Sequence, residues 1–338
     1  MIHYIPEELI IKIVNYSDSV ANLAQYRLVC RLWNTIVEPL MFSKCITINS
    51  AHGALALFGH LYRQPTYGKL IRHIHFEDYL PGTIQQGLLH LAFTPNMERI
   101  TGEIDDDDFY LLMNSIAEKG RGKFDKLKAI PHPSCYSAAY VITLLNFQST
   151  LEEVSVSLKY DNDQDYNSSW DLPSKMELFV SLVKLELEAD MEALFDTEAM
   201  LVDCPRLKEL TLTLGFNDTI HVKSEIEAWA PTNVKIIDTV KKLRITHECR
   251  SDLLEYLLFK YPNTDTIEID VSRPLIASNN NLQRTVNVIK AMRFYKVNFV
   301  VNHTDLTSYL KFINADGIPF CVEEDDENEK FRIQISNF

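Results

Sequence analysis

Two short runs hold the side chains with the clearest chemical potential. His73, His75 and Glu77 alternate along one segment, so in a strand their side chains would point the same way. Imidazole and carboxylate groups bind zinc, but no further ligand of clear spacing accompanies these residues. We therefore expect ordinary surface histidines here and no metal site.

The second run begins with Asp161, Asp163 and Asp165, as a calcium-binding loop does. Tyr166 replaces the glycine that such a loop needs, and its twelfth position is Leu172 instead of glutamate. We expect an exposed polar loop that does not bind calcium tightly.

The sequence also lacks a glycine-rich phosphate loop, a nucleophile elbow and an HExxH motif. These features predict a protein that is not an enzyme and uses no cofactor.

Charge is distributed unevenly over the 338 residues, whose formal net charge is -14. Residues 1–50 contain four basic and four acidic side chains, so the whole acidic excess follows residue 50. Nucleic acids and anionic membrane surfaces attract clustered lysine and arginine. The composition therefore argues against both as partners.

The six cysteines lie far apart and form no CxxC pair. This spacing predicts buried, reduced thiols and not a disulfide framework. Glu7 and Glu8 interrupt the apolar core that a secretory signal would need, and no stretch approaches the ~18 apolar residues of a spanning helix. We expect a cytoplasmic or nuclear protein, or one found in both compartments.

An apolar pattern, L-x-x-L-x-L, recurs along most of the chain at intervals of 24 to 33 residues. The last two members of each set alternate with polar residues, which predicts a short strand with one buried face. The clear copies are Ile71, Ile74, Phe76; Leu151, Val154, Val156; Leu182, Leu185, Leu187; Leu207, Leu210, Leu212; Val240, Leu243, Ile245; and Phe294, Val297, Phe299. Weaker copies start at Met97, Leu127 and Thr264.

Helical spacing separates these strands, as at Leu254, Leu257, Leu258 and Tyr261. A doubly wound sheet or a barrel would use strands buried on both faces, whereas these are short and one-sided. The pattern resembles the leucine-rich-repeat family over residues 46–338. That resemblance implies an α/β fold in which stacked repeats form a curved solenoid, with parallel strands on the concave face and helices outside.

Residues 1–45 lie outside the repeat and predict three short helices. Pro6, Glu7 and Glu8 suit a helix start, and the first helix has two apolar rows, one with Leu9, Ile13 and Tyr16 and one with Ile10 and Val14. Residues 19–30 predict the second helix, and Trp33, Ile36, Val37 and Leu40 mark the third. A domain with a surplus apolar row is expected to bury it against a partner. A helical cap on the solenoid would have a polar outer face, so the two apolar rows of the first helix argue against this alternative. A helix-turn-helix that binds DNA would need more basic charge than this region carries.

The stretch from Ile5 to Val37, IPEELIIKIVNY…NLAQYRLVCRLWNTIV, resembles an F-box, although Ser17 stands where a leucine is more common. The resemblance implies docking on a Skp-type adaptor and, through it, on a cullin-based ubiquitin ligase. It places six residues at the adaptor: Ile5, Pro6, Leu9, Ile13, Leu28 and Val29. Cys30 and Trp33 would help to hold the helices together.

The repeats would then select a protein substrate, with residues between the buried strand positions lining the concave face. Acidic side chains outnumber basic ones there, so we expect a substrate segment with some basic character; ordinary solvated charges are the competing interpretation. The residues expected to contact substrate are His75, Glu103, Glu153, Glu186, Glu188, Glu209, Arg244, Glu268 and Asp270. The sequence predicts a substrate-recognition subunit, and the alternative is an interaction scaffold that works without a ligase.

Overall fold

The structure, a computed structural model, has two compact units, residues 1–153 and residues 154–338. Each unit is described by itself. The structure describes residues 5–17, 20–77, 80–119, 123–135, 137–158, 172–201, 204–247, 249–270, 279–291, 296–315, 317, 319–325 and 330–336. The predicted calcium-like run from Asp161 to Asp165 lies outside these residues.

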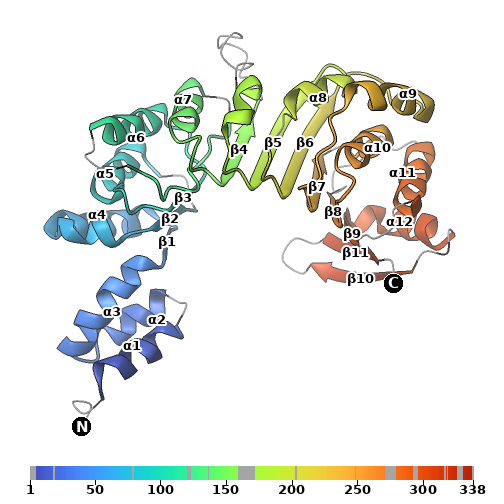
Figure 1. Ribbon diagram of the computed structural model, residues 1–338. Helices are drawn as coiled ribbons and strands as arrows, with labels where there is room; N and C mark the ends of the chain where they lie inside the picture. Colours follow the sequence, from blue (N-terminus) through green and yellow to red (C-terminus); the bar gives the residue numbers. More distant parts are fainter. Residues whose placement is uncertain are drawn as a thin grey trace. The chain divides into compact units, whose positions relative to one another are not determined.

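Three helices open the first unit and share one apolar core (Figure 1). They are α1 (Glu7–Asn15), α2 (Val20–Tyr26) and α3 (Arg31–Ser43). Pro6 is the N-cap residue of α1, where its missing N–H removes no helical hydrogen bond. The buried core consists of Ile10, Val14, Leu23, Ile36 and Val37. The three helices predicted for the N-terminus are therefore present.

Strands and helices then alternate through the rest of this unit. The elements are β1 (Cys45–Ile48), α4 (Ala51–Arg63), a 3-10 helix η2 (Pro65–Leu70), β2 (His73–Phe76), α5 (Gly82–Ala92), β3 (Arg99–Gly102), α6 (Asp107–Lys119) and α7 (Ala138–Asn146). The strands form a parallel sheet in the order β1-β2-β3. The weak repeat copy at Leu127 forms only isolated bridges, at Ala129 and His132, because Pro131 and Pro133 have no N–H to continue a ladder.

The second unit contains an eight-stranded sheet in the order β10-β11-β9-β8-β7-β6-β5-β4. Its strands are β4 (Glu153–Ser157), β5 (Lys184–Met191), β6 (Glu209–Phe216), β7 (Lys242–His247), β8 (Thr266–Asp270), β9 (Lys296–Asn302), β10 (Phe320–Asp325) and β11 (Lys330–Ser336). The connecting helices are η4 (Pro173–Leu178), η5 (Leu194–Asp196), α8 (Thr197–Met200), α9 (Lys223–Asn233), α10 (Ser251–Lys260), α11 (Asn279–Ala291) and α12 (His303–Ala315).

Strands β5 to β9 are parallel and in regular register. Their alternate residues form continuous buried rows, such as Leu185, Leu210, Leu243, Ile267 and Val297. Strands β5 to β8 therefore bury one side chain in two, as the repeat predicted, whereas β9 is buried on both faces from Val297 to Val301. The alternating α/β architecture is confirmed, and the sheet as a whole is mixed because of its last two strands.

The prediction that parallel repeats continue to residue 338 is wrong. Strand β11 pairs antiparallel with both β9 and β10. Only four residues separate β10 from β11, which is enough for a hairpin but too few for the crossover that a parallel pair requires. Glu323 and Glu324 belong to β10 and are exposed; residues 326–329, which follow them, lie outside the described residues.

The prediction of uniformly buried cysteines is also wrong. Cys204 and Cys249 are buried and Cys30 is half-buried, but Cys45, Cys135 and Cys321 are exposed. Cys45 begins β1, Cys135 lies in a loop and Cys321 lies in β10, whose residues from Phe320 to Glu324 are all exposed. All six are free thiols.

Candidate functional site

The N-terminal helices present an exposed apolar surface, formed by Leu9 and Ile13 of α1 and by Leu28 and Val29 between α2 and α3. Leu9 and Ile13 are 49% and 47% exposed, and Leu28 is 78% exposed. Tyr16, one turn beyond Ile13, is also exposed. We refer to Leu9, Ile13, Leu28 and Val29 together as the F-box apolar surface.

Helical geometry explains why α1 contributes to both the core and this surface. Ile10 and Val14 are four residues apart and enter the core, while Leu9 and Ile13 form the adjacent row on the solvent side. Leu28 and Val29 follow the end of α2 in a turn, where their N–H groups bond the carbonyl groups of Gln25 and Tyr26. The turn leaves both side chains outside the core.

The remaining residues predicted for this region lie differently. Ile5 is half-buried and packs against the helical core, so its side chain is less available than that of Leu9. Trp33 also packs against that core and meets the ring of Tyr26 edge-on, with 5.8 Å between ring centroids. Its indole N–H has no acceptor among the described residues. Cys30 is the N-cap residue of α3.

A buried acidic side chain, Glu38, was not anticipated from the sequence. It is 7% exposed, forms an ion pair with Arg27 and accepts a 2.6 Å hydrogen bond from the Tyr67 hydroxyl. This hydrogen bond, together with burial, raises the pKa of Tyr67. Phe42, His60 and Tyr67 stack beside it, with centroids 5.2 to 5.5 Å apart. These contacts connect α3 to α4 and η2.

Residues 2–47 match the F-box-like family model. The chain thus contains an F-box-like domain, and F-box domains generally bind Skp-type adaptors. No curated protein matches the chain. The match covers the three helices that carry the F-box apolar surface.

The residues predicted to contact substrate fall into two groups. Glu186, Arg244 and Glu268 occupy one register row of the large sheet, with Thr211 between the first two. Glu188 and Asp270 occupy the next row, and Glu209 the preceding one. His75, Glu103 and Glu153 belong to the first unit. We call the solvent-facing residues of β5 to β8 the exposed sheet face.

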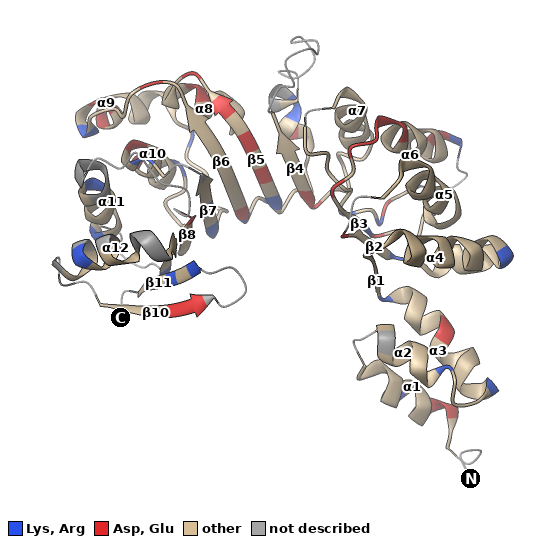
Figure 2. Ribbon diagram, turned by 180° about the vertical axis from the view of Figure 1, so that it is seen from behind, with Lys and Arg blue, Asp and Glu red and all other residues tan. Residues whose placement is uncertain are grey.

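Charged residues lie along these strands (Figure 2), and several of them are paired locally. Glu186 lies 2.8 Å from Lys184, Glu268 lies 2.8 Å from Arg244, and Asp270 lies 3.6 Å from Lys330. In the first unit Arg99 pairs with Glu153 at 2.6 Å, and His75 Nδ1 lies 2.9 Å from the Thr101 hydroxyl. Several of the acidic side chains on these strands are therefore already paired with a neighbouring cation.

Among the described residues, no group of three histidine, cysteine, aspartate or glutamate side chains is placed to hold a metal ion. His73 and His75 both extend from β2, but His73 approaches Glu98, at 3.6 Å. None of the helices in the described ranges has the length and apolar character needed to cross a membrane.

Proposed function

We propose that this protein is a non-catalytic substrate-recognition subunit of an SCF-type ubiquitin ligase. The observation that carries the proposal is the F-box apolar surface, an exposed apolar row within a domain that matches the F-box-like family. Burial of such side chains against a partner contributes roughly 25 cal/mol per Å² of apolar area. The surface would dock on a Skp-type adaptor and, through it, on a cullin.

The remainder of the chain would present the substrate. Its alternating strands and helices support a leucine-rich-repeat-like solenoid up to β9. The exposed sheet face would bind a protein segment with some basic character, in the cytoplasm or the nucleus. Such a receptor needs no catalytic residue, because it raises the local concentration of substrate near transferred ubiquitin.

The first test is co-purification with a Skp-type adaptor. Leu9→Glu places an unpaired charge in the centre of the expected interface and should reduce adaptor binding at least tenfold. Leu111→Glu is a matched control, because Leu111 of α6 is 50% exposed and lies outside the F-box-like domain. Circular dichroism should show that both variants remain folded.

The two variants distinguish the functional alternatives. Loss of binding by Leu9→Glu alone supports docking through the F-box apolar surface. If the folded wild-type protein does not bind the adaptor, the proposal fails. Adaptor binding without recruitment of a cullin would instead favour a ligase-independent interaction scaffold.

A further inference from the structure

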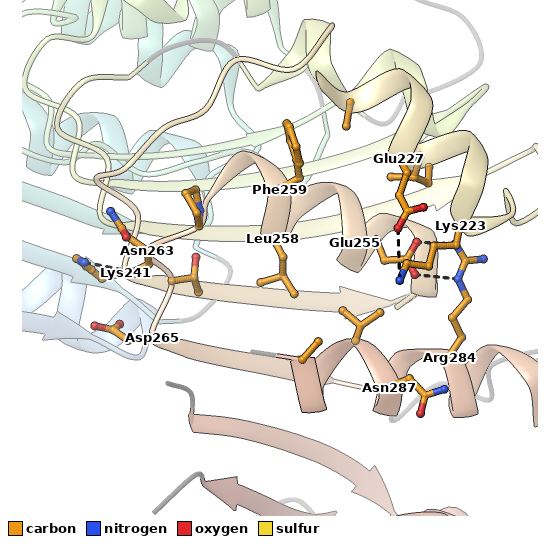
Figure 3. Close-up of a pocket in the computed structure, with 16 residues that line it drawn as sticks. Lys223, Glu227, Lys241, Glu255, Leu258, Phe259, Asn263, Asp265, Arg284 and Asn287 are labelled. Atoms are coloured by element: carbon orange, nitrogen blue, oxygen red, sulfur yellow. Dashed lines mark hydrogen bonds and ion pairs between the residues drawn. The ribbon is translucent and has the colours of Figure 1, made fainter. Parts of the chain in front are cut away.

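The second unit contains a cavity of about 890 Å³ among helices α9, α10 and α11 (Figure 3). Helices α9 and α11 both pack on α10. The floor is formed by Leu258 and Phe259 of α10, and Val288 of α11 contributes to the wall. All three side chains are half-buried. We call this space the three-helix cavity.

Polar residues close both ends of the apolar floor. At one end, Lys223 pairs with Glu227 at 3.4 Å, and Arg284 donates to both carboxylate oxygens of Glu255. Figure 3 shows these four side chains together, with Lys241, Asn263 and Asp265 beyond the opposite side of Leu258 and Phe259. A ligand of limited length fits between these ends, whereas a continuous peptide chain would have to displace ion pairs.

The two ion pairs also restrict the charge of the ligand. Glu227 and Glu255 neutralise Lys223 and Arg284, so a charged group at this end meets no net opposite charge. The guanidinium of Arg284 can nevertheless donate hydrogen bonds to a ligand. Of its five N–H groups, two donate to Glu255 and one donates to the carbonyl of His221. These contacts fix the guanidinium and, as far as the described residues are concerned, leave two N–H groups for an acceptor.

We propose that the three-helix cavity binds a small uncharged organic molecule with an apolar body and a carbonyl group directed at Arg284. The volume lies within the range of roughly 300–1,000 Å³ that small-molecule sites occupy, and the combination of apolar walls with a few fixed polar groups is typical of them. This inference concerns a surface separate from the F-box apolar surface. It holds or fails independently of adaptor binding.

Nile red, an uncharged fluorophore with an apolar body and a carbonyl group, is a suitable first probe. We expect saturable binding to the full-length protein. Val288→Trp and Ala291→Trp should fill the cavity and weaken binding at least tenfold, since both residues line it. Ala228→Trp is the matched control, because Ala228 is exposed on α9 and is not among the lining residues. Absence of saturable binding, or unchanged binding by both filled variants, would overturn the proposal.

Methyl NMR locates the probe independently of fluorescence. Addition of Nile red should shift the methyl signals of Ile226, Leu258 and Val288, which line the cavity, and leave that of Leu9 unchanged. Shifts confined to Leu9 and Ile13 would show binding at the F-box apolar surface and contradict the proposal.

The role of the carbonyl is tested with two ligands of similar size, 2-acetylnaphthalene and 2-ethylnaphthalene. One hydrogen bond from Arg284 should make the ketone bind about fivefold more tightly. Tighter binding of the hydrocarbon would contradict the assigned orientation.

Discussion

At the scale of single residues, Trp33 allows the contribution of packing to stability to be measured apart from that of hydrogen bonding. Its ring packs on the helical core and on Tyr26, but its N–H has no acceptor among the described residues. We expect Trp33→Ala to lower the free energy of unfolding by about 3 kcal/mol through lost packing, the low end of the range for a tryptophan because the side chain is half-buried. Trp33→Phe loses no hydrogen bond and should cost about 1 kcal/mol. Urea denaturation followed by circular dichroism measures both, and equal losses for the two variants would contradict this account.

The burial of Glu38 could not be predicted from the pattern of residues along the sequence. Ile36, Val37 and Leu40 predicted α3 correctly, but nothing in the local sequence distinguishes Glu38 from a solvated glutamate. Its burial depends on Arg27 and on Tyr67, which is 29 residues away. Tertiary partners at such separations leave no periodic signal in the sequence.

At the scale of elements, the Tyr67 hydroxyl connects η2 to α3. Tyr67→Phe removes its hydrogen bond to Glu38 and should cost about 1 kcal/mol. Because the pKa of Tyr67 is raised in the folded state, its contribution is complete below pH 10 and is lost as the pH rises further. The stability gap between wild type and variant should therefore narrow in alkali. Tyr62→Phe is the control, since Tyr62 is 70% exposed; a gap that widened above pH 10 would be inconsistent with this role.

The strands of the repeats and their parallel direction were predicted well up to β9, whereas the antiparallel direction of β10 and β11 was not predicted. The residues Leu185, Leu187, Leu210 and Leu212 alternate and lie in β5 and β6 as expected. Ile333 and Ile335 alternate in the same way, yet β11 runs antiparallel to β9. A period of two reports which face is buried and carries no information on direction. The three-helix cavity could not be predicted from the sequence either, because it depends on how α9 and α11 pack on α10.

At the scale of the whole molecule, the six thiols report on the folded state. Cys45, Cys135 and Cys321 are exposed and should react rapidly with a thiol reagent, and half-buried Cys30 more slowly. Burial raises the pKa of Cys249 to about 12, so little reactive thiolate forms near neutral pH. Cys204 and Cys249 should react only after denaturation. Rapid reaction of all six thiols in native buffer would show that these two sites open.

The antiparallel hairpin of β10 and β11 has a consequence for solubility. Strand β9 is buried from Val297 to Val301, and β11 satisfies its outer hydrogen-bonding edge. A chain that ends after α12 would expose this apolar edge to other molecules, and we expect it to self-associate. Light scattering after size exclusion should show oligomers of the truncated chain but not of the full chain, whose edge strand carries exposed Glu323 and Glu324. The hairpin thus protects the molecule against edge-to-edge aggregation.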